Sequence, residues 1–357
     1  MDVAMVYPRF DNLGGAERFG LEVMAEWTKR HKVTLYALSV NKRLLEEYNV
    51  EVDAIECKVN VPGWRSNTLT LMAAVKSMSR MLGRHELYVL NTFPAHVIDR
   101  HPNVWYPQEP ARMLYDLYPE ILKRPDMTLG RRLFMSAYFP LLRSLDKRFN
   151  RSDMMLANSR YSAEYLGRVY GVKPQVVYCG ARPVEGGKGG SDYAFSVGRL
   201  TYEKRTELAV QAAKEAQVKI KVVGTGPEEA ALRKIGGADA EFLGAVGKDE
   251  LNRLYSNALC TVYAPLREPF GLVPLESMAA GTPVIGGMTG GYTEVIEDGV
   301  DGFLVEEEAG HIAERIRWLI DNKAEYTGMS ARAMKKAGKY TWAETADTIL
   351  KEAQDGA

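Results

Sequence analysis

The feature that most constrains the fold of this chain is the repeated alternation of short apolar runs with longer helical patterns. The runs VAMVY (3–7) and KVTLYAL (32–38) have the length and composition of buried strands. Between them, Phe19, Val23 and Trp27 recur at spacings of four and indicate a helix over residues 16–30. Repeated strand–helix–strand units predict an α/β chain with doubly wound parallel sheets and helices on both faces. Further strands are expected at 86–90, 103–107, 153–159, 193–198, 218–224, 240–244, 259–265 and 282–286.

A glycine-rich segment, CGARPVEGGKGGSD, divides this alternation into two series. Glycine at that density disfavours regular structure and favours a flexible connector. We therefore expect one Rossmann-like domain over residues 1–178, a hinge over 179–192 and a second such domain over 193–340. The last helical pattern, at 341–357, fits either domain and is expected to pack back on the first. Domains of this kind bind ligands at the carboxyl ends of their strands.

Composition narrows the class of protein. The chain has 46 basic and 46 acidic side chains, so its average charge gives no case for nucleic-acid binding. Residues 1–178 carry 25 Lys and Arg against 19 Asp and Glu, and residues 179–357 carry 21 against 27. The first half therefore suits an anionic partner, although a charge difference that arose without any functional role explains the asymmetry equally well. Three scattered cysteines, and the lack of a signal sequence or a long apolar run, predict a cytoplasmic protein.

The segment EPFGLVPLE places Glu268 and Glu276 at the two ends of an apolar stretch. The pattern LVPLESMAAG reads as a helix with Pro274 at its first position and Glu276 in its first turn. The amides at the start of such a helix form an anion site, which suits a diphosphate. The two carboxylates would then bracket one extended ligand with hydroxyl groups at both ends. The alternative is that neither glutamate binds a ligand: Glu276 caps the helix and Glu268 is a solvated loop residue.

Two further loops carry candidate binding residues. In SVGRLTYEK, Arg199 and Lys204 follow the first strand of the second domain, where two cations could neutralise a departing diphosphate. No D-x-D or dense His/Asp cluster is present, so no metal is expected. In FDNLGGAER, Gly14 and Gly15 would let the backbone approach a ligand closely, or would simply form a turn.

The segment VVGTGPEEA offers a competing interpretation. Gly224 and Gly226 follow a strand, and Ala230 lies near the third-glycine position of a dinucleotide fingerprint. The segment lies mid-chain, and no obvious ribose-binding acid ends the next strand. A nicotinamide site is therefore the less favoured alternative.

Together these segments resemble the retaining, nucleotide-sugar-dependent group 1 (family 4) glycosyltransferases of the GT-B fold. The resemblance covers nearly the whole chain. It is carried by GGAE (14–17), ANSRYSAEYL (157–166), VGRLTYEK (197–204), GTGPEE (224–229), FLGAV (242–246) and, most specifically, residues 268–305, which begin EPFGLVPLESMAAGTPVIGG.

The resemblance implies a role for each matching position. Glu276 would bind the ribose, Glu268 would lie near the reacting carbon of the sugar, and Arg199 and Lys204 would bind the diphosphate. Catalytic roles are thus expected for Glu268, Arg199, Lys204 and Gln108, and donor binding for Gly14, Gly15, Gly244, Phe270, Gly271, Leu272, Val273 and Glu276. Arg9 and Arg112 are candidates for binding the acceptor.

The implied activity is metal-independent transfer of a hexose, with mannose and glucose as candidates, from a UDP-, GDP- or ADP-sugar to an alcohol, with retention and without a further cofactor. One departure concerns YPQEPAR, where Gln108 stands at a position that is often His in the family. Glutamine hydrogen-bonds a hydroxyl but carries no proton in catalysis. A nucleotide-sugar epimerase or hydrolase, and a non-catalytic sugar-nucleotide-binding protein, are therefore retained as alternatives.

Two segments of the first domain bear on the acceptor. The pattern at 66–84 aligns Lys76, Arg80 and Arg84 in one stripe with an apolar face beside it. Together with residues 122–149 it predicts a basic, amphipathic surface for anionic lipid at the inner membrane face. Ordinary helices packed on a sheet explain the same pattern. A glycan, a lipid-linked sugar or a small molecule is thus the expected acceptor.

Overall fold

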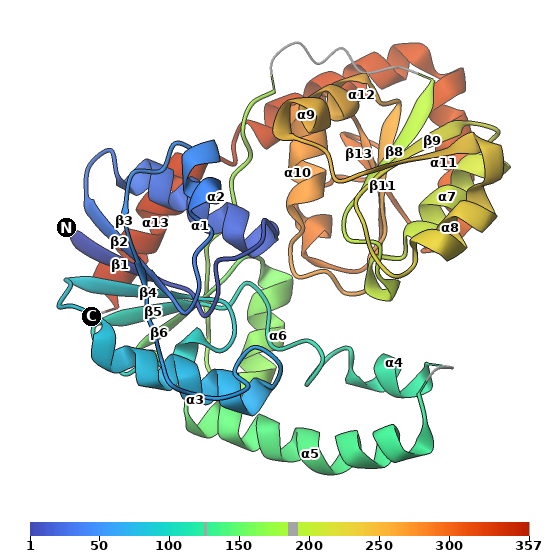
Figure 1. Cartoon of the computed structure of the whole chain (residues 1–357). Helices are drawn as coiled ribbons and strands as arrows, with labels where there is room; N and C mark the ends of the chain where they lie inside the picture. Colours follow the sequence, from blue (N-terminus) through green and yellow to red (C-terminus); the bar gives the residue numbers. More distant parts are fainter. Residues whose placement is uncertain (125–126, 185–191, 357) are drawn as a thin grey trace. The chain divides into compact units, whose positions relative to one another are not determined.

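The computed structural model describes residues 1–124, 127–184 and 192–356 and divides into two compact units (Figure 1). The first unit comprises Met1–Tyr178 with Ala343–Ala357, and the second comprises Cys179–Trp342. Of the predicted hinge at 179–192, residues 185–191 lie outside the described part of the chain. Cys179 and Ala181 are buried, and the Ala181 amide donates to the Tyr340 carbonyl within the second unit.

In the first unit the described strands form one parallel sheet in the order β3-β2-β1-β4-β5-β6-β7. Its strands are β1 (Asp2–Val6), β2 (Lys32–Ala37), β3 (Asp53–Glu56), β4 (Leu87–Asn91), β5 (Asn103–Tyr106), β6 (Met154–Ala157) and β7 (Gln175–Val176). Its α-helices are α1 (Gly15–Trp27), α2 (Lys42–Glu47), α3 (Thr68–Met78), α4 (Tyr118–Lys123), α5 (Leu129–Arg148), α6 (Arg160–Tyr170) and α13 (Trp342–Asp355).

The second unit repeats this architecture with the order β10-β9-β8-β11-β12-β13, again parallel throughout. Its strands are β8 (Tyr193–Val197), β9 (Lys219–Val223), β10 (Ala240–Gly244), β11 (Cys260–Tyr263), β12 (Val284–Gly287) and β13 (Gly302–Val305). Its α-helices are α7 (Thr206–Glu215), α8 (Glu229–Gly236), α9 (Lys248–Asn257), α10 (Leu272–Ala279), α11 (Ala309–Asp321) and α12 (Lys323–Ala337). The doubly wound α/β class predicted from the alternation is confirmed.

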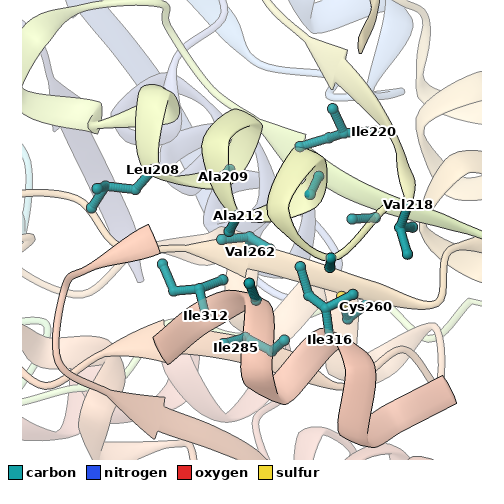
Figure 2. Close-up of a cluster of buried hydrophobic side chains, with 14 of the residues drawn as sticks. Leu208, Ala209, Ala212, Val218, Ile220, Cys260, Val262, Ile285, Ile312 and Ile316 are labelled. Carbon is teal, nitrogen blue, oxygen red and sulfur yellow. The ribbon is translucent and has the colours of Figure 1, made fainter. Parts of the chain in front are cut away.

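The core of the second unit lies between its sheet and the helices α7 and α11. Figure 2 shows Ala209 and Ala212 of α7 facing Ile312 and Ile316 of α11 over the strand residue Val262. These side chains are at most 2% exposed. Small alanines on α7 bring the helices close, and each buried valine or isoleucine side chain contributes about 1.5–3 kcal/mol. The site loops of this unit therefore rest on a closely packed frame.

The C-terminal helix α13 belongs to the first unit. Trp27 at the end of α1 donates its indole N–H to the Ala346 carbonyl at 3.0 Å, and the Thr345 hydroxyl donates to the Tyr178 carbonyl at 2.8 Å. The chain thus crosses from the first unit to the second near residue 178 and returns near 342.

Several elements differ from the sequence predictions. Strands β3, β7 and β13 were not predicted, and each has four residues or fewer. The helix expected over 66–84 ends as α3 at Met78, continues as a 3₁₀ turn to Met81, and leaves Arg84 outside it. The prediction that Lys76, Arg80 and Arg84 form a single basic stripe is therefore wrong, because Arg84 is not helical.

Candidate functional site

The strand order of the second unit creates a switch point between β8 and β11. These two strands are neighbours, but the chain leaves them toward opposite edges of the sheet. Doubly wound sheets bind ligands in the crevice outside the carboxyl ends of the strands at this position. The loop after β8 carries Arg199 and Lys204, and the loop after β11 carries Glu268. The fold thus brings two segments more than sixty residues apart to one place.

Lys204 and Glu268 form an ion pair at this switch point. The Lys204 Nζ lies 2.8 Å from the Glu268 Oε2, and the side chains are 18% and 13% exposed. The Gly291 amide donates to the Glu268 carbonyl at 2.8 Å and so fixes the loop. Burial and the nearby Glu268 carboxylate raise the pKa of the Tyr263 phenol well above its usual range. The Glu268 carboxylate is therefore held in a shielded position, and Lys204 balances its charge.

Helix α10 begins directly after this loop. Its N-cap is Gly271 with φ of +79°, and a Cβ there would lie 2.7 Å from the Tyr263 Oη. Only glycine tolerates this combination of backbone angle and contact. Among the described residues, α10 has no side-chain N-cap. Its first amides are thus directed out of the helix end, where they are available to an anionic ligand.

The start of α10 corrects two sequence predictions. Leu272 is its first residue, so Pro274 occupies the third position and Glu276 lies in the second turn. A proline at the third position is still compatible with the helix, because this amide has no partner within the helix. Glu276 is only partly buried and accepts a hydrogen bond from the Tyr255 hydroxyl at 2.9 Å. Glu276 is therefore not an N-terminal capping residue, and its carboxylate is oriented by a tyrosine.

The two cations of the loop after β8 differ in environment. The Arg199 side chain is 72% exposed and lies 3.8 Å from Glu203, whereas Lys204 is enclosed. Arg205, with φ of +50°, donates to the Glu307 carbonyl at 2.9 Å and ties this loop to the segment after β13. Lys204 is therefore positioned in advance, and Arg199 is free to reorient toward a ligand.

The glycines of VVGTGPEEA are explained by packing between loops. A Cβ on Gly224 would lie 1.9 Å from the Gly198 carbonyl oxygen, and one on Gly226 would lie 2.2 Å from the Leu200 carbonyl oxygen. The two glycines thus let the loop after β9 lie against the loop that carries Arg199. Gly244, at the end of β10, has φ of +65° and accepts a hydrogen bond from the Gly224 amide at 2.7 Å.

At the carboxyl edge of the first unit's sheet, Gln108 joins a cluster of amide side chains. Its side-chain amide donates to the Asn91 Oδ1 at 3.3 Å, and the Asn158 side-chain amide donates to the main-chain carbonyl of Gln108 at 2.8 Å. Gln108 adopts φ of +63°, an unusual angle for a residue other than glycine. Backbone strain of this kind is concentrated at binding sites. Asn91 and Asn158 were missed from the sequence, where an Asn at a strand end was the available signal.

The remaining predicted residues of the first unit have local partners or lie at a loop. Gly14 precedes α1, and its amide donates to the Glu17 carboxylate at 3.1 Å, while a Cβ on Gly15 would have open space. Arg9 pairs with Asp11 at 2.8 Å. Arg112 is 8% exposed and pairs with Asp116 at 2.9 Å. The Arg112 guanidinium is thus engaged in an internal ion pair, and Arg9 is the more accessible of the two.

Two features are absent from the described residues. No group of three or more His, Cys, Asp or Glu side chains is arranged to hold a metal ion within residues 1–124, 127–184 and 192–356. Across the same ranges, every helix is too short or too polar to cross a membrane.

Comparisons with known proteins agree with this geometry. Residues 181–339 match the family model for glycosyl transferases group 1, and residues 13–184 match the model for glycosyltransferase family 4. A GDP-mannose-dependent alpha-mannosyltransferase of Corynebacterium glutamicum is 29% identical over 161 residues, which cover 44% of this chain and 38% of that protein. An uncharacterised glycosyltransferase of Methanocaldococcus jannaschii is 33% identical over 170 residues, covering 44% and 42%. The matches thus span about half or less of these curated relatives.

Among solved structures, Anabaena HepE in complex with UDP-glucose superimposes with a TM-score of 0.76 at 20% identity, covering 99% of this chain and 100% of HepE. At this identity the likeness shows the fold, which is GT-B.

Proposed function

Since this chain belongs to the group 1 (family 4) glycosyltransferases, we propose that it transfers a hexose from a nucleoside diphosphate sugar to an alcohol, with retention and without a metal. The observation that carries the proposal is the Lys204–Glu268 pair at the switch point, beside the uncapped start of α10. A cation, a carboxylate and a helix N-terminus at one place are the groups that a diphosphate sugar requires.

In the proposed mechanism, the site acts mainly on the charge of the leaving group. Cleavage of the sugar–phosphate bond places negative charge on the departing diphosphate and positive charge on the sugar. Lys204, Arg199 and the first amides of α10 stabilise the diphosphate, which accounts for a metal-free reaction. Glu268 lies near the anomeric carbon and stabilises its positive charge. The acceptor hydroxyl passes its proton to the leaving phosphate, so the reaction needs no proton carrier at position 108.

Glu276 is assigned to the ribose of the donor. Its carboxylate is oriented by Tyr255 and lies one turn beyond the amides that bind the diphosphate. This spacing suits a ligand in which the ribose is attached directly to the diphosphate. The loop at Gly244 is assigned to the base. Of the relatives, one is named for GDP-mannose and another was solved with UDP-glucose, so mannose and glucose are the first sugars to test.

The acceptor is assigned to the first unit. Its excess of basic residues, with Arg9 at the loop after β1, suits an anionic or lipid-linked acceptor. We place the enzyme in the cytoplasm, where its donors are made, and at the inner face of an anionic membrane.

The test is a turnover assay with UDP-glucose, GDP-mannose and ADP-glucose in excess EDTA, with membrane lipid extract or simple sugars as acceptors. The proposal expects acceptor-dependent release of one nucleoside diphosphate and a product with the anomeric configuration of the donor, read by NMR. Release without any acceptor would indicate the hydrolase or epimerase alternative. A requirement for Mg²⁺ would contradict the metal-free mechanism.

A further inference from the structure

Helix α5 has one face anchored firmly to the first unit. Phe139, Leu142 and Asp146, spaced by three and four residues, are buried. The Asp146 carboxylate lies 2.8 Å from the His96 Nε2 and accepts hydrogen bonds from Tyr115 at 2.5 Å and Tyr170 at 2.9 Å. This network and the small apolar cluster around Leu142 hold α5 in one orientation. The direction of its opposite face is therefore fixed by the fold.

The opposite face of α5 is apolar and exposed. The side chains of Leu129, Leu133, Phe134 and Leu141 are 72%, 64%, 61% and 53% exposed. Ala137 and Pro140, also exposed, lie among them at helical spacings. We call this set of six residues the outer arc. In an ordinary surface helix this face is polar, so its composition needs a partner.

Charge selects the kind of partner. Five basic residues lie on α5, namely Arg131, Arg132, Arg143, Lys147 and Arg148. Its only carboxylate is Asp146, which is fully buried. The accessible charges of this helix are thus all positive, and Arg131 and Arg132 are exposed.

Helix α3 was the other segment that the sequence suggested for a lipid surface, but it has no comparable exposed apolar face. Its apolar residues Met72, Ala74, Val75 and Met78 are buried in the core of the first unit. Leu69 of α3 is 40% exposed, but most apolar residues of α3 pack into the core. By contrast, α5 has four large apolar side chains that are each more than half exposed. Figure 1 shows α5 at the margin of its unit, beside α4. The Tyr118 hydroxyl of α4 lies 3.2 Å from the Ser136 hydroxyl of α5.

We propose that the outer arc of α5 inserts into the surface of an anionic phospholipid membrane, with Arg131 and Arg132 contacting lipid phosphates. An apolar face flanked by arginines is the composition of helices that lie in the plane of a membrane interface. Pairing with α5 of a second copy is less favourable, because it would bring arginines together and α5 itself carries no accessible carboxylate. The inference rests on the proposed function in one respect: if the chain is a glycosyltransferase, attachment of its first unit to a membrane favours a lipid-linked acceptor.

The test measures binding of the full chain to vesicles by flotation. Vesicles of equal parts phosphatidylcholine and phosphatidylglycerol are compared with vesicles of phosphatidylcholine alone. We expect at least about tenfold tighter binding to the anionic vesicles, weakened by salt. The double variant Leu133→Ser/Phe134→Ser is expected to bind at least about tenfold more weakly, because two apolar side chains no longer enter the lipid. Arg131→Gln/Arg132→Gln is expected to lose the preference for anionic vesicles.

Val172→Ser is the matched control, since Val172 is 43% exposed in the same unit but lies outside the outer arc. It should bind vesicles like the wild type. Wild-type protein that ignores anionic vesicles, or a Leu133→Ser/Phe134→Ser protein that binds them unchanged, would overturn the inference. So would a dimer seen by light scattering that this double variant abolishes, because the arc would then be a self-association surface. Thermal stabilisation by nucleoside diphosphates, measured alongside, reports the donor site separately and shows which proposal has failed.

Discussion

Substituting Gly271, the N-cap of α10, by alanine tests whether the start of this helix is built as the structure shows. At φ of +79°, a residue other than glycine costs about 1–3 kcal/mol in backbone strain. The new Cβ would also lie 2.7, 2.9 and 3.1 Å from ring and hydroxyl atoms of Tyr263, which is 7% exposed and has little room to move. Overpacking of this kind adds about 1–3 kcal/mol. The expected loss in the free energy of unfolding is therefore about 2–6 kcal/mol.

The assay is differential scanning calorimetry of the wild type and two variants. For a unit of this size, 1 kcal/mol shifts Tm by about 2–4 °C, so Gly271→Ala should lower the transition of the second unit by roughly 4–24 °C. Gly299→Ala is the matched control, because Gly299 has φ of +72° in the same unit but a Cβ there meets nothing within 4 Å. Its expected shift is about 2–12 °C, roughly half that of Gly271→Ala, because strain contributes without overpacking. Equal shifts for the two variants would refute the close contact with Tyr263.

Three further predictions concern single side chains. Lys204→Ala should lower kcat by roughly 10²-fold, because the leaving diphosphate loses a fixed cation. An increase in KM with kcat unchanged would contradict this. Glu268→Gln should lower kcat but preserve nucleoside diphosphate binding measured by calorimetry, since its carboxylate is assigned to the sugar and not the diphosphate. His101 hydrogen-bonds Asp153, which raises the pKa of His101 above 6.5. His101 therefore stabilises the fold below pH 6.5 and loses this contribution as pH rises through its raised pKa. In urea titrations His101→Asn should reduce stability at pH 5.5 by under about 1 kcal/mol, because the ring is half exposed, and should have a smaller effect at pH 8.

The fold was largely predictable because its signal is local. Parallel strands buried on both faces produce apolar runs, and these stand out between helical patterns. Strand β13 escaped detection because its four residues, Gly302–Val305, follow a turn-like stretch rich in glycine and aspartate. The true start of α10 was misplaced by two residues because Pro274 is acceptable at either the first or the third position.

The details of the site were less predictable because they depend on contacts between distant segments. The sequence placed Lys204 and Glu268 near one ligand, but no local pattern shows that they pair with each other across 64 residues. The amide cluster of Gln108 with Asn91 and Asn158 likewise arises from three neighbouring strand ends. For α5, apolar residues occur on both faces, so only the structure distinguishes the anchored face from the outer arc.

The most direct test of the central claim is thermal stabilisation by UDP, GDP, ADP, TDP and NADP⁺ in EDTA, with wild type and Glu276→Gln compared. A ligand that binds only the folded state raises Tm by mass action. The account predicts that one nucleoside diphosphate stabilises the wild type selectively, and that its affinity falls about tenfold in Glu276→Gln, where a charged hydrogen bond to the ribose is lost. Stabilisation by NADP⁺ alone would contradict the account, and so would a nucleoside diphosphate that stabilises both proteins equally.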